Sequence, residues 1–237
     1  MILDTEVVQE LRAQPIGLPV PPLLQNGRKD CVGTCLRMIL QYYGMGISRD
    51  TLDQYLLKES TTHSLSTFPT DGALFARQQG LLVDIFAYNL CYTDPTHDSR
   101  LTPDALVAKL ERQQRALQDA YFAPLIESTI RCLQAGCRYA LEKPNIQRIQ
   151  TYLTARIPLL VSLNAAALYE EPMEALFTAH AVVLTGLVDG RIYFLDPNDG
   201  VERSTSPDQL LFAMLQSKVI ATSAYMLAIQ PARLASR

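Results

Sequence analysis

The amino-acid sequence predicts an α+β fold, in which an N-terminal helical half packs on a C-terminal antiparallel β-sheet. Before about residue 153, most apolar residues recur three and four positions apart, which is the spacing of helices. In the last third, short apolar runs predict strands, and Asp189-Gly190 between two of them is a strong hairpin signal. With 237 residues, folding buries roughly 70% of the extended-chain surface, so a core can form without a disulfide or a metal.

Most of the expected helices have a start or a stop signal. Residues 31–44 are apolar on most sides and end at Gly44, which predicts a helix in the interior. Thr102-Pro103 supply an N-cap and a first-turn proline, and Asn145 can cap a later helix. The segment 15–30 holds four prolines and two glycines, so we expect an extended arm or loop there. The expected helices cover residues 1–14, 31–44, 48–57 and 71–79, a helical hairpin over 103–141, then 145–153 and a segment opened by Ser206-Pro207.

The strand candidates are apolar runs bounded by turn residues. They cover residues 81–88, 156–164, 179–188, 191–197 and 223–230. We expect one domain of two lobes rather than two independent domains. Its expected parts are a helical lobe over about 1–97, a helical insertion over about 98–145 and a β-rich lobe over about 146–237.

The charge of the chain excludes one class of partner. Twenty-four acidic and 21 basic residues give a net charge of −3, and no run of Lys or Arg forms the cationic stripe that a phosphate backbone requires. We therefore expect no nucleic-acid partner. The N-terminus carries acids where a signal peptide needs basic residues, and no apolar run reaches the length of a membrane span. A cytoplasmic protein without a membrane span is expected, and the oligomeric state stays open.

The cysteines and histidines predict neither a disulfide framework nor a metal site. The five cysteines are odd in number, and a zinc site at Cys31 and Cys35 would need two more ligands in a chain with three histidines. We expect no metal and no other cofactor. Four cysteines are expected to be small buried hydrophobes, and two histidines to be solvated loop residues. These residues are Cys35, Cys91, Cys132 and Cys137, and His63 and His97.

Cys31 has the position of a nucleophile. It begins the expected interior helix directly after a loop, where unpaired backbone N–H groups and the helix dipole favour a thiolate. Gln25 stands six residues earlier, and its amide could donate to an oxyanion beside the backbone N–H of Cys31. Asp30 is the expected N-cap, and Arg28 and Lys29 could offset its charge. A nucleophile of this kind also needs a base and a group that orients the base.

His180 and Asp196 are the candidates for those two roles, since they lie near the two open ends of the expected hairpin. A simple two-residue turn at Asp189-Gly190 would place their side chains on opposite faces of the sheet. Both share a face if Asp196 lies opposite Val182 and diagonal to His180, which requires one extra residue in the pairing. We therefore expect an odd-length turn or a bulge between residues 187 and 196.

Two segments resemble one known family. QNGRKDCVGTCLRMILQYYG is similar to the active-site segment of papain-like cysteine peptidases that trim double-glycine leaders from bacteriocins, and HAVVLTGLVDGRIYFLDP is similar to their second segment. The resemblance implies a papain-like fold with Gln25 as oxyanion donor, Cys31 as nucleophile, His180 as base and Asp196 as the residue that orients it. The implied substrate is a peptide or a carrier-bound acyl group.

The chain departs from that family in two ways. Val32 stands where the family usually has a glycine, and it is expected to narrow the space beside the nucleophile. Cys31 and His180 lie about twice as far apart along the chain as in the compact leader peptidases, and the hairpin over 103–141 accounts for much of the excess. That hairpin is expected either to serve packing or to line the substrate groove.

Three functions are compatible with these residues. The first is a cysteine peptidase or amidohydrolase that works through a thioester acyl-enzyme. The second is an acyltransferase that forms an amide bond on the same triad, if an amine replaces water. The third is a non-catalytic peptide-binding module that keeps the fold.

Overall fold

The computed structural model describes residues 16–27, 30–60, 68–90, 92–116, 122–172, 179–216 and 224–232, without the side chains of residues 57–60 and 224. The helix expected over residues 1–14 lies outside these ranges, as do His63, Cys91 and the pair Arg28 and Lys29. Within the described ranges, every helix is too short or too polar to cross a lipid bilayer.

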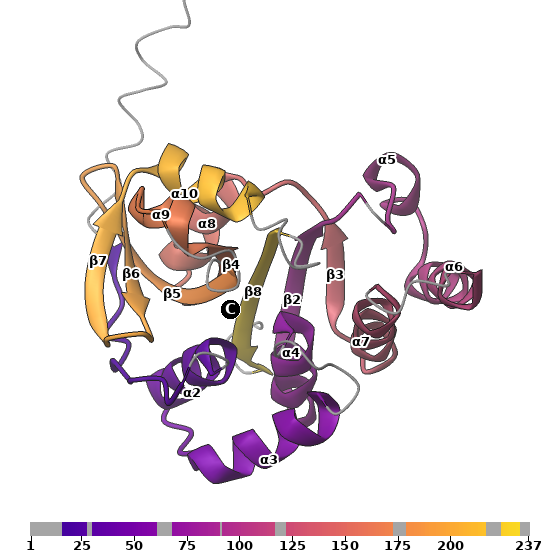
Figure 1. Cartoon of the computed structure of the whole chain (residues 1–237), viewed down its shortest axis with the longest axis horizontal. Helices are drawn as coiled ribbons and strands as arrows, with labels where there is room; N and C mark the ends of the chain where they lie inside the picture. The colour runs from indigo at the N-terminus through magenta and orange to yellow at the C-terminus, as the bar shows by residue number, and fades with distance from the viewer. Residues whose placement is uncertain are drawn as a thin grey trace, which may run out of the picture.

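One β-sheet organises the described part of the chain (Figure 1). Its strand order is β3-β2-β8-β4-β5-β6-β7, and β1 pairs with β5 outside this path. All of these pairs are antiparallel except β2 with β3, which are parallel. The strands are β1 (Ile16–Gly17), β2 (Leu81–Tyr88), β3 (Arg138–Leu141), β4 (Leu159–Asn164), β5 (Ala179–Val188), β6 (Arg191–Asp196), β7 (Val201–Thr205) and β8 (Ala224–Pro231).

Two of the helices begin at a capping residue that the sequence predicts. The side chain of Asn145 accepts a hydrogen bond from the Arg148 N–H at 2.8 Å, and Ser206 accepts one from the Gln209 N–H at 3.2 Å. The described helices are α2 (Cys31–Tyr42), α3 (Arg49–Ser60), α4 (Pro69–Gln78), α5 (Pro95–Asp98), α6 (Pro103–Ala116), α7 (Ala123–Gln134), α8 (Ile146–Thr154), α9 (Ala165–Tyr169) and α10 (Pro207–Leu215).

The structure corrects one expected helix. The helical hairpin consists of α6 and α7 and ends at Gln134. The expectation that it extends to residue 141 is therefore wrong. Residues 138–141 form β3, which pairs with β2 in parallel from Asp84 to Ala87. The sheet therefore includes β2 and β3 as well as the strands of the C-terminal third. The sequence analysis did not predict α5, α9 or β7.

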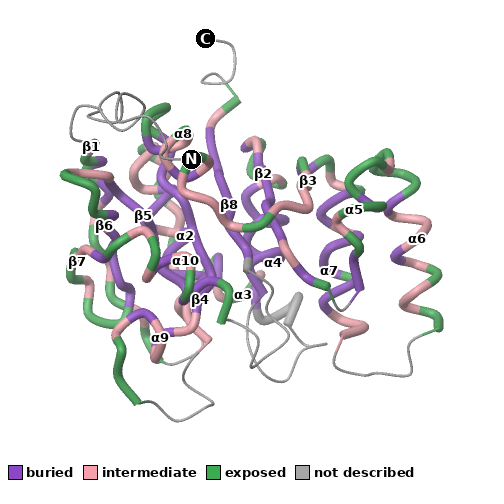
Figure 2. Tube along the Cα trace, turned by 90° about the horizontal axis from the view of Figure 1, so that it is seen from above, coloured by how far each residue is buried: buried purple, intermediate pink, exposed green. Residues whose placement is uncertain are grey.

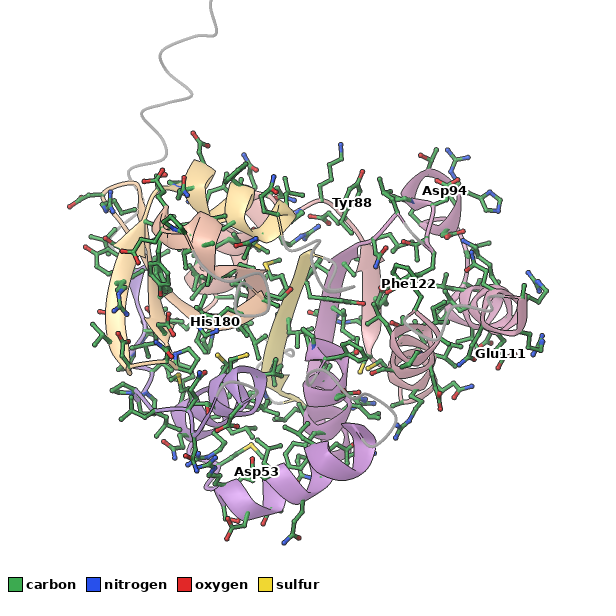
Figure 3. All side chains as sticks on the ribbon, viewed as in Figure 1. Asp53, Tyr88, Asp94, Glu111, Phe122 and His180 are labelled. Atoms are coloured by element: carbon green, nitrogen blue, oxygen red, sulfur yellow. The ribbon has the colours of Figure 1, made fainter. Side chains whose placement is uncertain are left out.

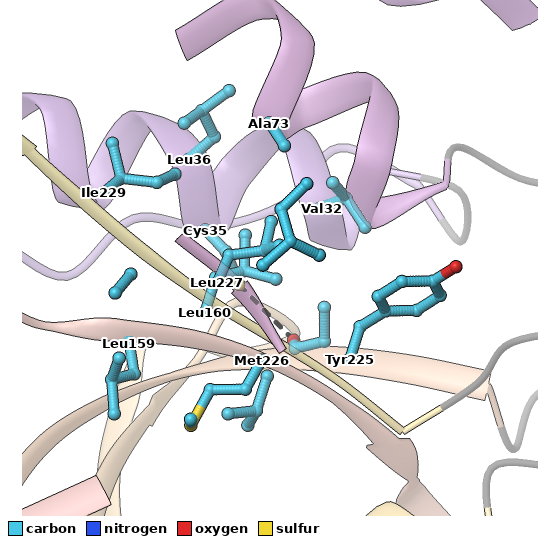
Figure 4. Packing of buried hydrophobic residues seen from close by; sticks show 14 of the residues in the cluster. Val32, Cys35, Leu36, Ala73, Leu159, Leu160, Tyr225, Met226, Leu227 and Ile229 are labelled. Atoms are coloured by element: carbon cyan, nitrogen blue, oxygen red, sulfur yellow. Dashed lines mark hydrogen bonds between the residues drawn. The ribbon is translucent and has the colours of Figure 1, made fainter. Parts of the chain in front are cut away.

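Helix α2 lies in the interior, as its composition predicts. Its buried positions include Cys35, Leu36, Met38 and Ile39, all with no exposed surface. Figure 4 shows Cys35 among the buried side chains Leu160 and Leu227, which belong to the same core cluster. The helix ends at Tyr42, and the turn that follows contains Gly44, whose φ of +74° suits a residue without a side chain.

Helices flank the sheet on both sides. In Figure 1, β5 passes between α2 below it and the group α8, α9 and α10 above it. Figure 2 shows that buried residues follow β4, β5 and β8, whereas exposed residues gather along α6 at one end of the molecule. The α+β fold class is confirmed, with its core between α2, α4 and the sheet.

Close packing of β1 on β5 depends on Gly186. A Cβ atom at this position would lie 2.4 Å from the backbone oxygen of Ile16, and Leu18 donates a 2.8 Å hydrogen bond to the Thr185 oxygen beside it. A main-chain atom cannot rotate away, so β1 would have to move. We expect Gly186→Ala to lower the free energy of unfolding by about 1–3 kcal/mol.

Urea unfolding measures this effect. Gly46→Ala is the matched control, because a Cβ on Gly46 would meet nothing within 4 Å, and we expect it to change stability by less than about 0.5 kcal/mol. Equal stability of the two variants would show that β1 does not pack on β5 this closely.

Candidate active site

Cys31 is the first residue of α2 and is half-buried with a free thiol. The first N–H groups of a helix have no partner within the helix, and its dipole is positive at this end. Both features favour negative charge on the Cys31 sulfur. The local sequence produces this arrangement because the proline-rich arm ends just before the apolar helix begins.

Asp30 occupies the N-cap position, but its side chain makes no capping bond to the helix. Its carboxylate instead accepts hydrogen bonds from the Asn26 N–H at 3.0 Å and the Thr34 hydroxyl at 3.1 Å, and Arg49 of α3 pairs with it at 3.3 Å. The negative charge beside Cys31 is therefore balanced by a cation that the sequence analysis did not identify. Nothing near Arg49 in the sequence signals this role, because the pairing depends on how α3 folds back.

The pairing of β5 with β6 places His180 and Asp196 on one face. Val188 pairs with Arg191 across a two-residue turn, so the extra residue is not between 187 and 196, and that part of the prediction is wrong. The register shifts between Leu184 and Gly186 instead. Beyond this bulge Val183 pairs with Leu195, so that Asp196 follows opposite Val182 and diagonal to His180, as expected.

The bulge lies there because β1 approaches β5 at the same point. Ile16 and Gly17 pair with Leu187 and Gly186, and Gly186 is the residue that gives the arm room. The turn itself has positive φ at both Asp189 and Gly190, which is the two-residue hairpin turn that Asp-Gly favours.

His180 interacts with both of the other candidates, Asp196 and Cys31. Its Nε2 atom is 2.8 Å from Asp196 Oδ1, and the ring also makes a hydrogen bond with Cys31. With Nε2 engaged by the carboxylate, Nδ1 is the ring atom available to the thiol. Burial disfavours the charged ring, but the hydrogen bonds and charges of Asp196 and Cys31 outweigh it and raise the pKa of His180 to about 10.

Asp196 is almost fully buried and receives several donors. The Asn198 N–H donates to Oδ1 at 2.7 Å, and the Tyr169 hydroxyl donates to Oδ2. Burial alone would raise the pKa of this carboxyl, but hydrogen bonds from His180 and Tyr169, together with the charge of the ring, lower it to about 2. Asp196 is therefore held as a carboxylate against the imidazole.

Tyr169 is a second residue that the sequence analysis did not identify. It ends the five-residue helix α9, and Arg203 lies over its ring at 5.6 Å. Burial and the hydrogen bond to Asp196 raise its pKa above the ordinary value, so it stays a donor. The sequence around α9 is too short to predict a helix, and nothing in it indicates a contact with Asp196.

Gln25 lies beside the end of β6, because its backbone N–H donates to the Pro197 oxygen at 2.7 Å. Its side-chain Oε1 is buried and accepts no hydrogen bond from the described residues. No described contact therefore fixes the oxygen end of this amide.

Val32 packs against α4. It is 4% exposed, and its Cγ1 faces Gly72 of α4, at 3.3 Å from where a Cβ on that glycine would lie. The Val32 side chain thus packs between α2 and α4. It fits there because Gly72 has no side chain.

The remaining cysteines and His97 lie where the sequence placed them, with one exception. Cys35, Cys132 and Cys137 are buried, and His97 is exposed. Cys137, however, follows the end of α7 instead of lying on its apolar face. In the described ranges, no group of three or more His, Cys, Asp or Glu residues could hold a metal ion.

The helical hairpin lies away from this site. In Figure 3, Glu111 of α6 and His180 are at opposite sides of the molecule. The hairpin was expected either to serve packing or to line the substrate groove. The position of α6 fits packing better.

Removing the Tyr169 hydroxyl tests its effect on Asp196. Tyr169→Phe deletes a donor that lowers the pKa of Asp196, so the carboxyl would protonate at a higher pH. We expect the acid limb of the rate of Cys31 alkylation by iodoacetamide to move to higher pH, with the fold retained. Tyr193→Phe, on the same strand as Asp196, is the control and should leave that limb in place. An unmoved limb in Tyr169→Phe would show that the hydroxyl does not act on Asp196.

Three solved structures are similar to the chain. A double-glycine motif protease from an AMS/PCAT transporter, solved in complex with its leader peptide, is 14% identical, with 93% of this chain and 99% of that chain covered and a TM-score of 0.45. A C39-like peptidase from Bacillus anthracis is 15% identical over 92% and 98%, with a TM-score of 0.46. The peptidase domain of Streptococcus ComA, a bifunctional ABC transporter of a quorum-sensing pathway, is 12% identical over 90% and 98%, with a TM-score of 0.42.

The search of curated proteins gave no match. The sequence pattern of one family, however, matches residues 17–217, which include every candidate site residue. The chain therefore belongs to the Peptidase_C39 like family of cysteine peptidases.

Proposed function

We propose that this protein is a cysteine peptidase that cleaves a peptide or amide bond through Cys31, His180 and Asp196. The position of His180 carries the proposal, since one ring nitrogen contacts the Asp196 carboxylate and the ring also bonds Cys31. A cysteine, a base in contact with it and a carboxylate in contact with the base are what thiol catalysis requires. The residues come from both ends of the chain, so residues 1–237 act as one catalytic domain of two lobes.

The reaction begins with the Cys31 thiolate and the His180 imidazolium. The thiolate attacks the carbonyl carbon, and the oxyanion that forms is stabilised by the Cys31 N–H and the Gln25 amide. His180 then protonates the leaving amine, and a thioester acyl-enzyme remains. Water activated by His180 hydrolyses the thioester and restores the free thiol. Asp196 keeps the ring oriented and stabilises its positive charge throughout.

A peptide is the proposed substrate. The transporter protease that is similar to this chain was solved in complex with a leader peptide.

A library of peptides from a digested cell lysate tests the proposal without a known substrate. Wild type is expected to create new N-termini in the library, and Cys31→Ala none. Cys35→Ala is the matched control, because Cys35 lies one turn further along α2 and its buried thiol bonds the Ala181 oxygen at 3.4 Å. It should cleave the same peptides as wild type. The absence of Cys31-dependent termini would contradict the proposal, and amides formed with an added amine would favour an acyltransferase.

A further inference from the structure

Cys132 and Cys137 meet at the end of α7, far along the chain from the candidate nucleophile. The helix stops in a Schellman motif: the Gly136 N–H donates to the Leu133 oxygen and the Cys137 N–H to the Cys132 oxygen, both at 3.0 Å, and Gly136 has a φ of +82°. The two residues that close this motif normally bring apolar side chains together. Here both carry thiols, and the two thiols are hydrogen-bonded to each other.

The environment of the two sulfur atoms differs. Arg77 of α4 donates to the Ala135 oxygen at 2.9 Å, which places its positive charge near Cys137. The hydrogen bond from Cys132 and the charge of Arg77 lower the pKa of Cys137. The bond to Cys137 and burial raise the pKa of Cys132, whose sulfur also lies 3.1 Å from the Thr70 oxygen. Cys137 is thus the thiol that ionises first.

Access also favours Cys137. Cys132 has no exposed surface, whereas Cys137 is 5% exposed and stands between the exposed residues Gly136 and Arg138. A small opening at the end of the helix would uncover Cys137 before Cys132. Geometry, charge and access therefore assign one sulfur to attack and the other to resolve.

We propose that Cys132 and Cys137 form a thiol–disulfide exchange site for low-molecular-weight disulfides such as glutathione disulfide. The Cys137 thiolate attacks one sulfur of the disulfide, which gives a mixed disulfide and releases one thiolate. Cys132 then loses its proton and attacks the Cys137 sulfur, which closes the protein disulfide and releases the second thiolate. Two protein thiols are oxidised and one small disulfide is reduced to two thiols. The site is independent of the peptidase reaction.

Trypsin cleaves after Arg131 and after Arg138, so both cysteines fall in one peptide, 132–138. This peptide reports the reaction. The folded full-length protein is equilibrated in glutathione buffers of increasing disulfide-to-thiol ratio, quenched with acid, alkylated and digested. We expect peptide 132–138 to lose two hydrogen atoms and to carry no alkyl group. Cys31 and Cys35 fall in a different peptide, 30–37, so their chemistry does not interfere.

The isolated peptide 132–138 is the reference. Because the fold already holds the two thiols together, the protein is expected to reach half oxidation at a disulfide-to-thiol ratio at least tenfold lower than the peptide. Half oxidation at the same or a higher ratio would overturn the proposal, since the fold would then give no preference for the disulfide.

Two serine variants separate the roles of the sulfurs. Cys132→Ser removes the resolving thiol and is expected to accumulate a glutathione adduct on Cys137. Cys137→Ser should form little adduct on Cys132 under the same conditions. The opposite pattern would overturn the assignment of Cys137 as the attacking thiol.

Discussion

Replacing His180 by glutamine is expected to slow the alkylation of Cys31 by iodoacetamide at about pH 6 by about 100-fold. An ordinary cysteine is ionised to well under 1% at this pH, and the thiolate is the reactive form. In the wild type, the His180 ring bonds Cys31, so the ring when protonated places a positive charge beside the sulfur. Glutamine can still bond Asp196 but carries no positive charge, so the thiol would have to ionise unaided.

Mass spectrometry of peptide 30–37 measures the rate and contains its own reference. Cys35 lies in the same peptide, and its burial raises the pKa of its thiol, so it should stay unmodified in both proteins. Equal rates for Cys31 in wild type and His180→Gln would contradict the proposed pair. That result would favour the binding module that keeps the fold without catalysis.

The stability of the protein is expected to be highest between about pH 4 and pH 6.5. The pKa of His180 is raised from 6.5 to about 10, so its contribution is complete below pH 6.5 and is lost as the pH rises toward 10. The pKa of Asp196 is lowered from 3.8 to about 2, so its contribution is present above pH 3.8 and is lost as the pH falls toward 2. We expect the alkaline loss to be about 2–4 kcal/mol, since the His180 side chain is 11% exposed and little screened.

Urea unfolding across this pH range measures the effect. Asp196→Asn removes the charge that helps to raise the pKa of His180, so the alkaline decline of the variant should begin at lower pH and be shallower. A variant with the same alkaline decline as wild type would show that other groups cause it.

Local patterns in the sequence were sufficient for the nucleophile helix and the hairpin. Residues 31–44 combine a nearly all-apolar helix with a glycine stop; α2 begins at Cys31 as expected, ends at Tyr42, two residues before that glycine, and is buried. Asp189-Gly190 predicted a turn that the structure has. Such features depend on neighbours in the chain, which a single sequence displays.

Features that depend on distant segments could not be predicted. The strand at 138–141 exists because β2 offers it a parallel partner more than 50 residues earlier. The bulge between Leu184 and Gly186 is located by the approach of β1, and Tyr169 reaches Asp196 from a helix of five residues. In each case the partner segment is distant along the chain and becomes a neighbour only in the folded structure, so the local sequence does not indicate the contact.

The candidate site residues were proposed on a different basis. Gln25, Cys31, His180 and Asp196 occur in two motifs whose chemistry limits the residue types allowed at each place. The residues that support them carry no such restriction. Arg49 balances Asp30 and Tyr169 donates to Asp196, yet many residue types could occupy those positions in an ordinary helix.

The mass of the protein after reaction with an activated acyl donor, such as a p-nitrophenyl ester of a blocked glycine, tests the central claim most directly. We expect one acyl group to be added, located on Cys31 in peptide 30–37, and to be released by water over time. Cys31→Ala should gain no acyl group at that peptide, and Cys35→Ala should behave as wild type. An acyl group on another residue, or none on Cys31 of the folded wild type, would contradict the claim that Cys31 is the nucleophile.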